Sequence, residues 1–278
     1  MSVACSILIP AHNEAGYVGA CLEALLASEA TGSAVEVIVM ANGCGDGTAG
    51  IARGFAQRLA AKGWPLTVLD LVRGGKMGAL NAGDRTARHG ARIYLDADVI
   101  VSPALVAQLA AMLDAQTARY ASGTPVVRAA GSAFTRAYAR FWAGLPFCTH
   151  GTPGFGVFAV NHAARLRWGA FPEIISDDTF VRLSFAPQER FRVPALYDWP
   201  MIEGAGPLVR VRRRQDIGVA EVQALYPDLW ANRDPWPADA PLLWRRALGD
   251  PLGFAAYALV GLGVRLPHRK GERWARGR

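Results

Sequence analysis

Two aspartates separated by one alanine are the residues of this chain that most directly suggest chemistry. Asp96 and Asp98 end the apolar segment 92–95. Because side chains alternate between the two faces of a strand, both carboxylates can point the same way across Ala97 and receive a divalent cation. Hard oxygen ligands favour Mg²⁺ or Mn²⁺, which usually bridge to substrate phosphates. The triplet therefore predicts a metal site for a nucleoside diphosphate, although such an acidic pair can also merely cap the helix that follows.

Four apolar segments are expected to form the strands that position this and other polar groups. They begin at Ser6, Val35, Leu66 and Ala91, and helical apolar spacing follows at 16–28 and from Lys76. Strand and helix alternate four times, which predicts an α/β fold with a doubly wound, mostly parallel sheet flanked by helices. Ligands bind beyond the carboxyl ends of the strands in such sheets, and a polar segment follows each of these strands.

The polar segments resemble the motifs of family 2 glycosyltransferases, which have the GT-A fold. The matching stretches are P-A-H-N-E at 10–14, A-N-G-C-G-D-G-T at 41–48, K-M-G-A-L-N-A-G at 76–83 and D-A-D at 96–98, in this order. Four ordered matches are more specific than any one of them. The resemblance covers residues 5–100 and extends less firmly to 215.

The resemblance implies roles for residues of the first half. Many relatives carry two aspartates where this chain has Ala41 and Asn42; an amide donates as well as accepts hydrogen bonds, so the base of the donor stays open. Asn13 and Glu14 also suit a loop and the first turn of a helix, and Lys76 suits an exposed surface. The implied nucleotide and donor residues are Pro10, Asn13, Glu14, Asn42, Lys76 and Asp96, with Asp98 as the metal ligand.

The segment after the acidic triplet is less regular. Its pattern predicts helices at 102–114 and 132–142 and an extended segment at 120–128. Three glycines at 150–158 precede an apolar strand. They either allow the backbone to approach a sugar closely or form a plain turn.

Two adjacent carboxylates begin the next expected helix. Asp177 and Asp178 follow Ile174 and Ile175, which suggest a strand end. An ordinary helix cap is one interpretation. The resemblance implies an acidic doublet whose second member, Asp178, is the catalytic base, while Asp177 caps the helix or binds the acceptor.

A basic segment follows at 209–215, where arginine alternates with valine. As a strand it would place Arg210, Arg212 and Arg214 on one face, where guanidinium groups could hold the departing diphosphate together with the neighbouring Arg213. As a solvated basic edge it would only discourage pairing with another sheet.

Composition places the chain among globular proteins. It has 278 residues, 51% of them apolar, which excludes disorder. We expect a catalytic domain at 1–215, with a nucleotide-binding half at 1–100 and an acceptor half at 101–215, and a basic helical extension at 216–278. The four cysteines lack metal-type spacing and are expected to be reduced thiols.

The chain has a net charge of +7, and much of the excess of Lys and Arg over Asp and Glu lies after residue 205, which favours anionic partners. Nucleic acid is not expected as a partner, because no nucleic-acid motif is present. The apolar segment 252–262 lies between cationic flanks, so residues 244–278 either contact an anionic membrane or pack on the catalytic domain. Without a leader or a long apolar run, the chain is expected in the cytoplasm, at most at the inner face of the membrane.

Together these features predict a metal-dependent, inverting glycosyltransferase. It would move one sugar from a nucleoside diphosphate sugar to a hydroxyl of a saccharide or lipid-linked acceptor, in the synthesis of cell-envelope glycan, polysaccharide or glycolipid. Single addition is favoured because the sequence lacks Q-x-x-R-W. A sugar-phosphate nucleotidyltransferase and a non-catalytic, membrane-docked nucleotide-sugar-binding protein are the alternatives.

Overall fold

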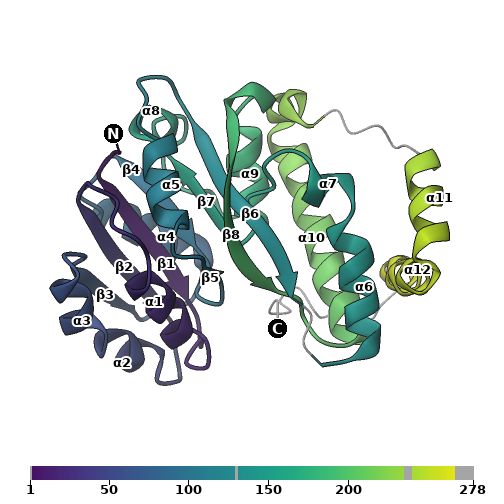
Figure 1. The fold of residues 1–278 in the computed structure, drawn as a ribbon, viewed down its shortest axis with the longest axis horizontal. Coiled ribbons are helices and arrows are strands. Elements are labelled where there is room, and N and C mark those ends of the chain that lie inside the picture. The colour runs from purple at the N-terminus through teal and green to yellow at the C-terminus, as the bar shows by residue number, and fades with distance from the viewer. Residues whose placement is uncertain (1, 129–130, 235–239, 267–278) are drawn as a thin grey trace. The chain divides into compact units, whose positions relative to one another are not determined.

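The computed structural model describes residues 2–128, 131–234 and 240–266, which form two compact units (Figure 1). Interleaved segments build the units. The first comprises Met1–Pro125, Thr152–Glu173 and Ser184–Trp199, and the second Val126–Gly151, Ile174–Leu183 and Pro200–Arg278. The boundary expected at residue 215 falls inside a helix of the second unit.

An eight-stranded mixed sheet runs mainly through the first unit. The four strands predicted from the first 100 residues are present and parallel, whereas β7 pairs antiparallel with β4 and with β6, and β5 with β8. The predicted α/β sheet flanked by helices is confirmed, with a second half that is antiparallel. The strand order is β3 (Leu66–Leu71), β2 (Val35–Asn42), β1 (Cys5–Ala11), β4 (Ala91–Leu95), β7 (Val157–Val160), β6 (Tyr120–Arg128), β8 (Arg190–Pro200) and β5 (Ile100–Val101).

Helices cover both faces of strand β1. Ile7 and Ile9 belong to one apolar cluster with residues of α1 (Val18–Leu26) and α5 (Leu105–Met112). On the other face Leu8 packs against α4 (Lys76–Thr86), where a Cβ added at Gly83 would lie 2.9 Å from the Leu8 side chain. Burial on both faces explains why this strand is a continuous apolar run. The remaining short helices of this unit are α2 (Thr48–Arg53), α3 (Ala56–Ala61), α4 (Lys76–Thr86), α8 (His162–Arg165) and η1 (Pro187–Glu189).

Helices form most of the second unit. Figure 1 shows α12 (Pro251–Arg265) beside α6 (Ala133–Ala143), and aromatic rings join the two helices. The ring centroid of Phe141 lies 5.7 Å from that of Phe254 and 5.2 Å from that of Tyr257. Asp250 caps α12 by accepting a hydrogen bond from the Gly253 N–H at 3.0 Å. The helices of this unit are α6 (Ala133–Ala143), α7 (Pro146–Thr149), α9 (Asp177–Leu183), α10 (Ala205–Leu225), η2 (Pro227–Asn232), α11 (Ala240–Gly249) and α12 (Pro251–Arg265).

Two local expectations for the second unit are wrong. Residues 209–215 belong to α10 and not to a strand, so successive residues are about 100° apart and Arg210 and Arg212 do not share a face. No strand precedes α9 at 174–175.

The expected membrane contact of residues 244–278 falls only partly on the described chain. Its basic residues His268, Arg269, Lys270, Arg273, Arg276 and Arg278 lie outside the described residues. Within the described ranges, no helix has the length and hydropathy that a membrane span needs.

Candidate functional site

Polar loops at the carboxyl ends of β1 and β2 are fastened to each other. Asn13, which has a positive φ of 55°, accepts a hydrogen bond from the Gly45 N–H at 2.7 Å. The Glu14 N–H donates to Thr48 Oγ1 at 2.8 Å. Since β1 and β2 are parallel neighbours, these bonds hold the two loops at one edge of the sheet. Pro10 lies in β1, half-buried and in register with Met40.

Asn42 joins three segments of this edge. Its buried side chain donates from Nδ2 to the Ala11 carbonyl at 2.8 Å and accepts the Gly75 N–H at 3.0 Å through Oδ1. The next residue, Gly43, has φ 60°, and a Cβ there would lie 2.6 Å from the Gly74 nitrogen, so only glycine fits. Asn42 therefore braces the end of β1 and the start of α4. Its contact with a base stays a prediction.

The acidic triplet lies in a turn that follows β4, not in the strand itself. The Val99 N–H donates to the Asp96 carbonyl at 3.1 Å, and the Asp96 N–H donates to the Gly156 carbonyl at 2.8 Å. We expected Asp96 and Asp98 to point the same way because they would lie in a strand. This expectation is wrong, because the two residues lie in a turn. Lys76, the first residue of α4, places Nζ 3.1 Å from Asp96 Oδ1, and both side chains are 37% exposed. Asp98 is half-buried.

The glycine-rich segment packs tightly against this turn. Gly156 has φ 77°, and a Cβ there would lie 2.7 Å from Trp199 Cδ1 and 2.9 Å from Val99 Cγ2. These contacts within the protein are enough to require glycine at this position, so no bound sugar is needed to explain it. They favour the interpretation as a tight turn.

The carboxylates of the turn could serve a divalent ion only with help from other oxygens. No group of three histidine, cysteine, aspartate or glutamate side chains is gathered for a metal ion in the part of the chain that the structure describes. Mg²⁺ and Mn²⁺ sites built from one or two carboxylates are completed by water and substrate phosphates. Asp96 and Asp98 fit that type of site.

The thiol near the turn is unsuited to metal binding at neutral pH. Burial, together with the negative charge of Asp96, raises the pKa of the Cys21 thiol to about 12. Thiolate is the form that binds metal, so Cys21 remains a neutral core residue. All four cysteines are free, as expected for reduced thiols.

The second unit carries the two adjacent acids at the start of α9. Asp178 Oδ1 accepts hydrogen bonds from the Thr179 N–H and the Ser176 hydroxyl, both at 2.7 Å. Asp178 thus takes part in the helix start, a role expected for Asp177, and Asp177 is buried. The function of Asp178 as a base stays a prediction.

The arginines of α10 differ in their surroundings. Arg212 pairs with Asp216 at 2.9 Å, and Arg213 Nη2 donates to the Gly263 carbonyl at 2.8 Å near the end of α12. The Arg212 pair therefore lies within α10, whereas Arg213 joins α10 to α12. Arg210 is exposed. A role of these arginines in diphosphate binding stays a prediction.

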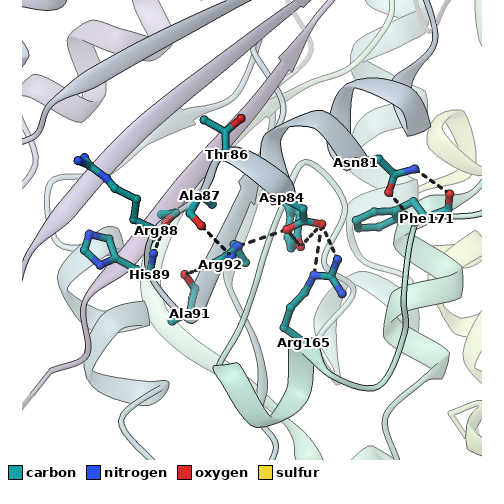
Figure 2. A network of polar contacts seen from close by, with 12 residues as sticks. Asn81, Asp84, Thr86, Ala87, Arg88, His89, Ala91, Arg92, Arg165 and Phe171 are labelled. Atoms are coloured by element: carbon teal, nitrogen blue, oxygen red, sulfur yellow. Dashed lines mark hydrogen bonds and ion pairs between the residues drawn. The ribbon is translucent and has the colours of Figure 1, made fainter.

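A buried charge cluster that sequence reasoning missed lies in the first unit (Figure 2). Asp84 of α4, only 7% exposed at its side chain, lies 3.2 Å from Arg92 Nε and 2.8 Å from Arg165 Nη2. Tyr94 also donates its hydroxyl hydrogen to Asp84 at 2.9 Å. Burial, with the charge of Asp84, raises the pKa of Tyr94, so the phenol remains a donor.

The Asp84 cluster ties together elements that carry site residues. Arg92 belongs to β4, which leads to Asp96, and Asp84 belongs to α4, which begins with Lys76. Arg165 comes from α8, 81 residues from Asp84 along the chain. No pattern in the sequence pairs residues so far apart.

The chain resembles known proteins in sequence and in fold. The model of the family described as "Glycosyl transferase family 2" matches residues 6–164, which is more than half of the chain. No curated protein matches the sequence. In structure the chain is similar to the mannosyltransferase PcManGT from Pyrobaculum calidifontis in complex with GDP-Man and Mn²⁺, at 19% identity and a TM-score of 0.63 over 94% of this chain and 74% of that chain.

Two further solved structures are similar. S. aureus TarS 1–349 is 15% identical, with a TM-score of 0.54 over 94% of this chain and 89% of that chain. Glucosyl-3-phosphoglycerate synthase from Mycobacterium tuberculosis, in complex with Mn²⁺, UDP and glucosyl-3-phosphoglycerate, is 18% identical, with a TM-score of 0.54 over 84% of this chain and 82% of that chain. These likenesses confirm the GT-A fold. With its four motifs on the carboxyl edge of the sheet, the chain belongs to glycosyl transferase family 2.

Proposed function

We propose that this glycosyltransferase moves a single hexosyl group from a nucleoside diphosphate sugar to an acceptor hydroxyl, with inversion and with a divalent cation. The observation that carries the proposal is the turn after β4, where Asp96 pairs with Lys76 and Asp98 follows Asp96 in the same turn. Two carboxylates and one cation suit a diphosphate with its metal ion. The acceptor would be a saccharide or lipid-linked glycan of the cell envelope, and we expect the enzyme in the cytoplasm.

The residues of the first unit would bind the donor. Asp98 would ligate Mg²⁺ or Mn²⁺ directly, and Asp96 would be held by Lys76 near the diphosphate. The bound cation supplies positive charge that stabilises the leaving group. Pro10, Asn13, Glu14 and Asn42 would form the nucleotide pocket. Pre-formed hydrogen bonds between these loops support that role, because a loop already ordered loses less entropy on binding.

Residues of the second unit would serve the acceptor and the departing diphosphate. Asp178 would take the proton of the acceptor hydroxyl as the oxygen attacks the anomeric carbon. Asp177 would bind the acceptor. Of the three arginines, Arg210 is the first choice for contact with the diphosphate, because its side chain is exposed. Arg212 and Arg213 already bond to neighbouring groups of the protein.

Calorimetry with GDP and UDP, each with Mn²⁺, Mg²⁺ or a chelator, tests the donor site. Mn²⁺ is the first ion to use, because it accompanies GDP-Man in PcManGT and UDP in the mycobacterial synthase. We expect Asp98→Ala to abolish metal-dependent binding and Asp96→Ala to weaken it less. Asp114→Ala, an exposed acid after α5, is the control. Unchanged binding in the Asp98 variant would remove the metal assignment. Transfer is then assayed with a panel of GDP- and UDP-hexoses.

A further inference from the structure

Helix α12 carries a row of exposed leucines. Leu252, Leu259, Leu262 and Leu266, the last just beyond the helix end, are 75%, 59%, 58% and 66% exposed. Their spacing of seven, three and four residues places them on one side of an α-helix. We call these four residues the leucine stripe.

The opposite side of α12 is packed. Gly253, Ala256 and Val260 are buried, and the helix contacts α6 and α10. A Cβ at Gly263 would lie 2.7 Å from the Val209 side chain of α10. The helix is therefore apolar on both sides, and its packing holds the leucine stripe outward. A helix that is apolar all round is normally buried, so an exposed stripe indicates an interaction surface.

Helix α11 adds apolar surface of the same kind. Trp244 is 65% exposed and Leu248 is 82% exposed. Figure 1 shows α11 next to α12, and the two helices are in contact. Tryptophan is enriched where a protein meets the boundary between lipid and water.

The charges around the leucine stripe are mainly positive. Arg245 on α11 and Arg265 at the end of α12 are exposed. Asp250 is the only acid among residues 243–266, and it pairs with Arg140 at 2.7 Å. After residue 266 the sequence has five Arg or Lys and one Glu. The surface therefore suits an anionic partner.

We propose that α11 and α12 dock on the surface of an anionic lipid bilayer, with the leucine stripe in the interfacial region and the arginines at the lipid phosphates. A second copy of the chain fits less well, because it would bring the same arginines against each other. At 15 residues α12 is about 22 Å long, shorter than the hydrocarbon core, so it would lie along the surface. The leucine stripe contains none of the residues assigned to sugar transfer, and docking does not depend on the proposed function.

Vesicle co-sedimentation of the full chain, without donor or acceptor, tests the proposal. Vesicles of phosphatidylcholine alone are compared with vesicles containing phosphatidylglycerol, at low and high salt. We expect binding to the anionic vesicles that salt weakens. Leu259→Ser/Leu262→Ser should lower the partition coefficient on the order of a hundredfold. Arg245→Gln/Arg265→Gln should lower it about 25-fold on anionic vesicles only, at roughly fivefold per arginine.

Matched controls distinguish docking through α12 from nonspecific adsorption of exposed apolar residues and from unfolding. Ile217→Ser/Leu225→Ser changes two residues of α10 that are 51% and 57% exposed, close to the values for the stripe pair, and should leave binding unchanged. Circular dichroism should report intact helices in every variant. The proposal is overturned if the wild type ignores anionic vesicles at low salt, or if the α10 control weakens binding as much as the stripe variant. A dimer in light scattering that the stripe variant converts to monomer would overturn it in favour of a second copy.

Discussion

Asn42 and Asp84 in the first unit each bond to more than one segment of the chain, whereas in the second unit aromatic rings join α6 and α12 beside the ion pair of Arg140 with Asp250. Directional hydrogen bonds fix the distance and orientation of the loops that they join. Apolar contacts are less directional, and a helix packed through them can keep a second apolar side exposed. The first unit thus suits a site that must be ordered before the ligand arrives, and the second suits a surface that meets an extended partner.

A catalytic base at Asp178 would give the second unit a role in the reaction, and this would be the clearest exception to the contrast between an ordered first unit and a docking second unit. Asp178→Asn should lose about 10² to 10⁴ in turnover, because the amide cannot accept the acceptor proton. Its oxygen can still accept from the Thr179 N–H, so α9 should remain folded. Asp177→Asn should mainly change acceptor affinity. Single-turnover transfer assays measure the rate of the chemical step in both variants. A normal rate in Asp178→Asn together with a lost rate in Asp177→Asn would make Asp177 the base.

The buried cluster of the first unit should be its most sensitive structural point. Asp84→Ala leaves Arg92 and Arg165 with side chains only 11% and 16% exposed and no anion between them. We expect a loss of about 3–5 kcal/mol in the free energy of unfolding, measured in urea. Asp70→Ala removes a partner from the exposed pair with Arg53 and should cost at most about 1 kcal/mol. Equal losses in the two variants would contradict the role of burial.

Lys76 should matter for binding more than for stability. Its pair with Asp96 is more than one-third exposed, so Lys76→Met should change the free energy of unfolding by at most about 1 kcal/mol. Loss of a charge-assisted contact to the diphosphate should weaken donor binding about tenfold or more. Calorimetry with the donor nucleotide checks this. The control is Arg58→Met, which disrupts another exposed pair, with Glu23, and should leave donor binding unchanged.

The smallest effect is expected on the exposed side of α12. Leu259→Ser/Leu262→Ser should alter the free energy of unfolding by less than about 0.5 kcal/mol per residue, as surface substitutions usually do. Val260→Ala, on the packed side and 2% exposed, should cost at least about 1 kcal/mol. Thermal unfolding of both variants is the measurement. A large loss in the leucine variant would mean that the stripe packs within the protein in solution.

Local pattern was sufficient to locate the four strands that lie within the first 95 residues. The strands predicted to begin at Leu66 and Ala91 begin there in the structure, because a short apolar run between turn residues is a local signal. The motif residues at the ends of the strands lie at one edge because parallel strands bring their carboxyl ends together.

The same local pattern misled in two places. At 209–215 the alternation of valine and arginine has the period of a strand, yet α10 runs from 205 to 225 and buries Leu208, Gly218 and Val222, which lie outside that window. At 96–98 the chain leaves the strand for a turn because the Asp96 N–H bonds to Gly156, 60 positions later in the sequence.

The sequence by itself determined the order of the elements, the four motifs and the apolar character of the segment 252–262. Only the tertiary structure decided that Asp84 meets Arg165, that Asn42 braces Gly75, and that one side of α12 packs on α6 and α10 while the leucine stripe stays exposed. The physical reason is range. Periodicity records which residues share a face of one element, whereas the pairing of buried polar atoms and the covering of apolar faces depend on contacts between residues distant in the chain.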